Sequence, residues 1–215
     1  EVREPQSGPS VANRVKQLLL SNKRVATYLK DIYYRFNQIN SPHPSDSQVI
    51  DDAVEFVKAR SEPYVLWIHL MNPHYPYYFD KADFEQFSDQ LYDANRYSRI
   101  HSKAMTHVTS GGYVTQCSPA ERQYLIDGYD ASIRGVDREL ERLVDVIDES
   151  TTQLFVTADH GEELWERGNF GHAARPKKPR DATLYNEMLH IPLWAYGANV
   201  NPETVSRSVS LIDIL

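Results

Sequence analysis

Residues 153–172 read QLFVTADHGEELWERGNFGH, and this stretch decides which kind of fold the sequence predicts. Its first six residues are mostly apolar, which is typical of a strand buried on both faces of a parallel sheet. The apolar run stops at Asp159-His160-Gly161, and a second Gly-His pair follows at Gly171-His172. Two interpretations are open. A helix begins with Asp159 as its N-cap, or Asp159 and His160 form part of a site beyond the strand end.

Two more apolar runs of strand length flank this one, YVLWIHL at residues 64–70 and IPLWAY at residues 191–196. Ser118-Pro119-Ala120-Glu121 is a helix start with a capping box, and apolar residues then recur at steps of three and four as far as Ile147. Ser45 and Gln48 predict another capped helix of about four turns. Residues 79–117 are polar and weakly periodic, so an irregular segment with a short helix near residues 83–90 is expected.

Helices that alternate with apolar strands indicate an α/β fold, a layered α/β/α sandwich with a mainly parallel sheet. We assign residues 46–215 to this domain. Residues 1–45 carry helical patterns that this assignment does not include, and residues 209–215 begin a further element.

Composition narrows the classes of function. The chain has 215 residues, a net charge of −7 and a sequence pI near 5.6, which argues against a nucleic-acid partner because polyphosphates require a basic surface. No stretch approaches the roughly 20 apolar residues of a membrane span. Cys117 is the single cysteine, so no disulfide forms within the chain.

The residue types at the strand ends suit a metal site. A carboxylate and an imidazole, as in Asp159 and His160, can bind one divalent ion, and Gly161 allows the turn that would bring both to it. His74 lies in a loop after residues 64–70 and would, by itself, be a surface histidine. His69 lies within that run, where a hydrogen-bonded core histidine is expected.

The order of these motifs resembles the C-terminal half of the sulfatase branch of the alkaline phosphatase superfamily. The matching pieces are Asn72-Pro-His-Tyr-Pro76, Tyr129-Asp-Ala-Ser-Ile-Arg-Gly-Val-Asp137, Thr157-Ala-Asp-His-Gly-Glu162, Gly171-His172, Ile191-Pro-Leu193 and Ser210-Leu-Ile-Asp213. By this resemblance Asp159 and His160 are metal ligands, and His74 contacts the sulfuryl or phosphoryl group. His172 stands where many arylsulfatases carry a lysine that contacts the transferred group and the leaving oxygen.

The resemblance implies metal-dependent hydrolysis of a small-molecule sulfate or phosphate ester. The expected cofactor is one divalent ion, calcium first, with magnesium or manganese as alternatives. A histidine in place of lysine titrates near neutrality, so activity is expected to fall as the pH rises through the pKa of His172. Two other functions stay open: a phosphodiester or phosphonate hydrolase or phosphoglycerol transferase of the same superfamily, and a non-catalytic module that binds an anion or a partner.

The nucleophile of the family is a formylglycine made from Cys or Ser in a Cys/Ser-x-Pro-x-Arg motif. Cys117-Ser-Pro-Ala-Glu-Arg122 has one residue too many before the arginine, and it follows the His74 loop, where the family has no nucleophile. We therefore expect an incomplete domain that lacks the nucleophile and is inactive alone. The strands at residues 64–70 and 153–158 would then need a missing segment, or self-association through uncovered sheet edges, to cover them.

Overall fold

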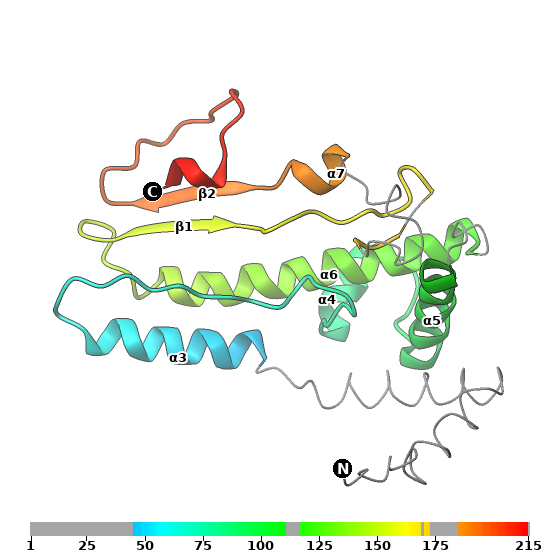
Figure 1. The fold of residues 1–215 in the computed structure, drawn as a ribbon. Coiled ribbons are helices and arrows are strands. Elements are labelled where there is room, and N and C mark those ends of the chain that lie inside the picture. Colours follow the sequence, from blue (N-terminus) through cyan, green and yellow to red (C-terminus); the bar gives the residue numbers. More distant parts are fainter. Residues whose placement is uncertain (1–44, 111–116, 169, 173–184, 215) are drawn as a thin grey trace, which may run out of the picture.

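The computed structural model describes residues 45–110, 117–168, 170–172 and 185–214, and for residues 105–110 it describes the backbone alone. The helical patterns of the first 44 residues lie outside this part of the chain. The described helices are α3 (Asp46–Ala59), α4 (Lys81–Phe87), α5 (Ala94–Ser110), α6 (Pro119–Val144) and α7 (Asn186–Leu189). The strands are β1 (Gln153–Thr157) and β2 (Leu193–Gly197), and a 3₁₀ helix, η2, spans Leu211–Ile214. Figure 1 shows their arrangement.

The long helix α6 organises the described part of the chain. It begins where the sequence predicts, since the Ser118 side chain accepts from the Glu121 N–H and the Glu121 carboxylate accepts from the Ser118 N–H, with Pro119 in the first turn. Helices α3, α4 and α5 all pack against α6, and α3 lies alongside its C-terminal half (Figure 1). The capping box predicted at Ser45 and Gln48 is confirmed at the start of α3.

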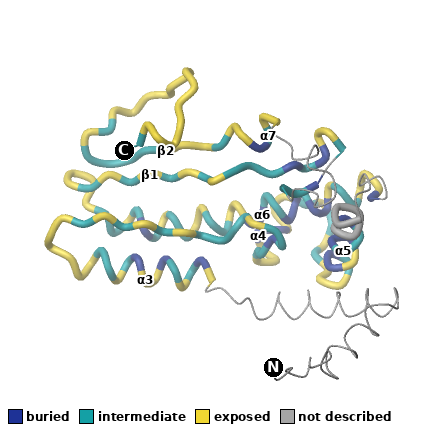
Figure 2. The backbone as a smooth tube through the Cα atoms, viewed as in Figure 1, coloured by how far each residue is buried: buried dark blue, intermediate teal, exposed yellow. Residues whose placement is uncertain are grey.

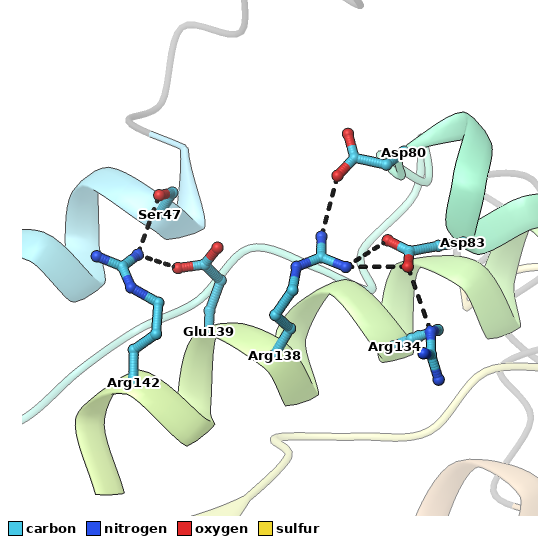
Figure 3. Close-up of polar contacts among 7 residues, drawn as sticks. All are labelled: Ser47, Asp80, Asp83, Arg134, Arg138, Glu139 and Arg142. Atoms are coloured by element: carbon cyan, nitrogen blue, oxygen red, sulfur yellow. Dashed lines mark hydrogen bonds and ion pairs between the residues drawn. The ribbon is translucent and has the colours of Figure 1, made fainter. Parts of the chain in front are cut away.

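Arginines on α6 connect it to its neighbours through carboxylates (Figure 3). The Asp83 side chain on α4 is 5% exposed and lies between Arg138, at 2.9 Å, and Arg134, at 3.3 Å. Arg142 pairs with Glu139 on its own helix and reaches Ser47 on α3. These contacts fix the rotation of α6 relative to α3 and α4, because the N–H groups of a guanidinium donate hydrogen bonds only in certain directions.

The core has two parts. An aliphatic cluster lies between α3 and the end of α6, and contains Ile50, Ala53 and Leu143 with Leu66, Ile68, Leu70 and Leu154 packed on it. An aromatic cluster surrounds the first half of α6, and its large members are Tyr77, Phe84, Tyr97, Tyr124, Trp165 and Phe170. Figure 2 shows the buried residues gathered along the helices, while β2 and the residues after it are mostly exposed or intermediate.

Helix α5 was not predicted, because residues 79–117 were expected to be irregular apart from a short helix. The short helix is found as α4, slightly earlier than expected. The buried face of α5 carries Tyr97, Ser98 and His101 beside Ile100 and Ala104. Polar-looking residues at these positions conceal the helical period, because a count of strongly hydrophobic residues leaves out tyrosine, serine and histidine.

The predicted parallel sheet is wrong for the described residues. The strands β1 and β2 pair antiparallel, with Phe155 opposite Ala195. Residues 64–70 are extended but form no strand in the described part of the chain, and Val65 and Trp67 are 98% and 87% exposed. An apolar run does not encode the direction of a strand. In residues 64–70 only one face is covered by helices, so alternate residues are exposed. The observed architecture is a mixture of helices and a small sheet, consistent with an incomplete α/β domain.

In the described ranges, none of the helices is both long enough and apolar enough to cross a bilayer.

The Asp83→Ala variant tests the link between α4 and α6. Removing a carboxylate that is 5% exposed and paired with two arginines should lower the free energy of unfolding. The expected loss is about 1–2 kcal/mol, because both arginines are half exposed and can be rehydrated. Asp80→Ala is the control, since that carboxylate is 74% exposed, pairs only with Arg138 among the described residues, and should cost much less. Equal urea denaturation midpoints for the two variants would contradict this assignment.

Candidate active site

Two loops that are far apart in sequence, around His74 and around residues 159–172, meet at His172. The His172 ring centroid lies 5.0 Å from that of His74 and 4.3 Å from that of His160. Asp159 joins them, because its Oδ1 lies 3.8 Å from His160 Nε2. The structure therefore brings together all four residues that the sequence singled out. Their chemical roles stay predictions.

The chain leaves β1 at Thr157 and turns without starting a helix. Residues 158–163 are not helical, and Asp159 Oδ1 accepts from the main-chain N–H of the next residue, His160, at 3.0 Å. An N-cap would accept from a residue two or three positions later, so the interpretation of Asp159 as a helix cap is wrong. Gly161 donates its N–H to the carbonyl of Met188 at 2.9 Å, which ties the turn to α7.

The orientation of His160 suits a metal ligand. Its Nδ1 lies 2.8 Å from the carbonyl oxygen of Gly161. A carbonyl only accepts, so Nδ1 carries the hydrogen and Nε2 presents a lone pair. That lone pair is on the nitrogen nearest Asp159, whose side chain is 83% exposed. No set of three or more His, Cys, Asp or Glu side chains within the described ranges is arranged to hold one metal ion, so the pair supplies part of a coordination shell at most.

A tight hairpin returns the chain so that His172 lies beside the turn. Gly171 donates to the Glu163 carbonyl at 2.9 Å, and Leu164 and Phe170 form an antiparallel bridge. The Trp165 ring stacks on Phe170 with centroids 4.3 Å apart. Gly171 has a φ of 83°, a left-handed conformation that glycine adopts without strain, so the Gly before His172 serves the return of the chain.

Glu162 is a member of the site that the sequence did not reveal. Its side chain is 5% exposed, and its Oε2 lies 3.2 Å from His172 Nδ1. This carboxylate, by its hydrogen bond and its charge, raises the pKa of His172 although burial acts against it. In the sequence Glu162 is only the last residue of the Thr157–Glu162 motif, with no role of its own. Only the hairpin, whose closure no spacing rule predicts, brings it to His172.

The His74 loop is fastened at both ends by buried polar groups. Asp46 on α3 accepts from the N–H groups of Met71, at 2.9 Å, and Asn72, at 3.3 Å. Tyr75 Oη lies 2.7 Å from Nδ1 of His101 on α5, and the two rings stack. Burial raises the pKa of Asp46 and lowers that of His101 to about 3. These contacts determine where the exposed ring of His74 lies.

Two other residues considered in the sequence lie away from the site. Cys117 is 2% exposed, burial raises the pKa of its thiol, and its chain segment continues into the cap of α6, so it is a structural residue as predicted. His69 was predicted to be a core residue, and this prediction is wrong. It is exposed because residues 64–70 are covered on one face alone.

Comparison with known proteins identifies the family of the chain. Residues 10–215 match the family model described as Sulfatase, which is most of the chain. The protein therefore belongs to the sulfatase family, as the resemblance predicted. The match also spans residues 10–45, which carry none of the motifs. No curated protein matches the chain.

The Gly161→Ala variant tests whether the turn needs a glycine. A Cβ at this position would overlap the main-chain carbonyl oxygen of Glu187, so the turn and α7 would have to separate. A loss of about 1–3 kcal/mol in unfolding free energy is expected from urea denaturation. Gly135→Ala is the matched control: a Cβ there meets nothing within 4 Å, and alanine in mid-helix should stabilise by about 0.5–1 kcal/mol. The contrary result would be equal stability in both variants.

The buried His101 should make stability depend on pH. Its folded pKa of about 3 lies below the ordinary value of 6.5, so the unfolded chain binds the extra proton first and stability falls as the pH drops below 6.5. Above pH 6.5 His101 is neutral in the folded and the unfolded chain, so it no longer lowers the stability. Between pH 8 and pH 5 this group alone should cost about 2 kcal/mol. Denaturant unfolding at both pH values should show a smaller difference in His101→Gln, while an unchanged difference would refute the prediction.

Proposed function

We propose that the protein is a sulfuric ester hydrolase and that the site around His172 binds the ester and its metal ion. The observation that carries this proposal is the convergence of three imidazole rings, from residues 74, 160 and 172, with the Asp159 carboxylate in a chain of the sulfatase family. A cluster of imidazole and carboxylate groups where two loops meet has the composition of a catalytic or ligand-binding site.

Asp159 and His160 fit two positions in the coordination shell of a divalent ion. Their nearest donor atoms lie 3.8 Å apart, and the His160 tautomer leaves Nε2 free to coordinate. A bound ion would act as a Lewis acid on the ester oxygens. Calcium is the family expectation, with magnesium and manganese as the comparisons. All three ions prefer oxygen ligands, so the Asp159 carboxylate is the more typical ligand of this pair.

His172 and His74 are proposed to contact the ester group itself. The hydrogen bond to Glu162, together with the charge of that carboxylate, favours the protonated form of His172, which can then donate a hydrogen bond to an anionic oxygen or to the leaving oxygen. The exposed ring of His74, in edge contact with His172, lies on the side from which a small molecule can approach. Both rings would stabilise the negative charge that increases on the ester oxygens as the ester bond breaks.

The nucleophile is proposed to lie outside the described residues, so that the described part of the domain would be inactive alone. Cys117 is buried at the start of α6 and cannot serve. The phosphodiesterase-type relatives share the same kinds of metal ligand, so the geometry around His160 does not separate them from sulfatases. Self-association through the exposed strands also stays a prediction.

Turnover of an aryl sulfate and of an aryl phosphodiester by the complete protein tests the function. Preference for the sulfate is expected, and single replacement of His172, His74 or Asp159 by alanine should lower kcat/KM on the order of 100-fold or more. His69→Ala is the matched control, an exposed histidine outside the site that should leave turnover unchanged.

Three results would contradict the proposal in different ways. Preference for the phosphodiester would assign the protein to that branch of the superfamily. Unchanged turnover in the His172 and Asp159 variants would place the active site elsewhere. Absence of turnover, together with metal binding by calorimetry that Asp159→Ala and His160→Ala leave unaltered, would favour a non-catalytic module.

A further inference from the structure

We propose that Glu162 is a positioning residue, whose buried carboxylate holds the His172 ring in one orientation and one tautomer. This inference rests on the proposed function only in assigning His172 to the ester. The carboxylate oxygens lie 3.2 and 3.4 Å from His172 Nδ1, while the Glu162 side chain is 5% exposed and that of His172 is 24% exposed. Nδ1 of His172 is thus held by the Glu162 carboxylate.

The chemistry of this pair defines which nitrogen a substrate meets. An ionised carboxylate accepts hydrogen bonds and donates none, so Nδ1 of His172 must carry a hydrogen. Nε2, on the far side of the ring, is then the nitrogen left for the ester, whether or not the ring is protonated. Without Glu162 the ring could rotate about its side-chain bonds and place either nitrogen outward.

Among the described residues, the Glu162 carboxylate has one hydrogen-bonding partner. In the described part of the chain, His172 is the one side chain within hydrogen-bonding distance of this carboxylate. The charge of Glu162 also acts on the phenol groups of Tyr77 and Tyr129, whose pKa values are raised first by burial and then by this charge. Both phenols therefore stay neutral, and His172 is the basic group that the described residues offer to the Glu162 carboxylate.

A role as a third metal ligand fits the geometry less well. Asp159, His160 and Glu162 do not form a set around one ion within the described residues. The Asp159 side chain is 83% exposed whereas that of Glu162 is 5% exposed. The Asp159 carboxylate thus faces solvent, while the Glu162 carboxylate lies beneath the surface against His172. Glu162 thus acts through His172, and it is His172 that would touch the ester.

The ring nitrogens of His172 in the full chain give the direct test. In ¹⁵N-correlated NMR spectra, the wild type should show a hydrogen on Nδ1 of His172, and Glu162→Gln should lose this preference because an amide can donate as well as accept. Glu166→Gln is the control, an exposed glutamate on the same hairpin that should leave the ring unchanged. A wild-type ring whose Nδ1 carries no hydrogen would overturn the proposal. The spectrum requires no turnover, so it decides the proposal even when neither ester is hydrolysed.

Kinetics on the complete protein separate positioning from a merely structural role. Glu162→Gln should lower kcat by roughly 10- to 100-fold, the usual cost of losing a group that orients a functional histidine. If Glu162 acts through His172, the same substitution made in a His172→Ala background should lower kcat no further. A loss of the same size in both backgrounds would overturn the positioning role, and so would a kcat of Glu162→Gln equal to that of the wild type.

Discussion

Packing of aromatic side chains against the first half of α6 is the interaction on which the candidate site depends. Tyr77 belongs to the His74 loop and Phe170 to the hairpin that carries His172, and their rings meet in edge contact at 6.1 Å. Both belong to the aromatic cluster with Tyr124 of α6. Burial of such rings is the largest favourable term available to irregular segments, which have few backbone hydrogen bonds of their own. Two loops remote in sequence are therefore held side by side.

Buried polar groups then give this packed arrangement one defined geometry. Asp46 binds the two N–H groups that begin the His74 loop, His101 binds Tyr75, and Glu162 binds His172. A buried carboxylate or imidazole that loses its partner costs far more than an intact pair contributes, so alternative loop positions are excluded. Aromatic packing could tolerate small shifts of the loops. The hydrogen bonds of these buried groups would break under the same shifts.

The sequence predicted the capped helices well and the sheet poorly. The start of α6 follows from Ser118, Pro119 and Glu121, because a cap is a local contact between residues three positions apart. The strands β1 and β2 were located, but their antiparallel pairing was not, since pairing depends on residues about 40 positions apart. Helix α5 was missed because tyrosine, serine and histidine occupy its buried face.

The sequence by itself determined the chemical types at the site and the order in which they follow the elements. Asp159, His160, His74 and His172 were recognisable because strand ends followed by histidines and glycines are local patterns that match a family. Only the tertiary structure decided that the His172 ring lies 5.0 Å from that of His74 and 4.3 Å from that of His160, and that the Glu162 carboxylate lies next to His172 Nδ1. The reason is that the closure of the hairpin and the packing of its rings against α6 depend on contacts across the whole chain, which no local pattern records.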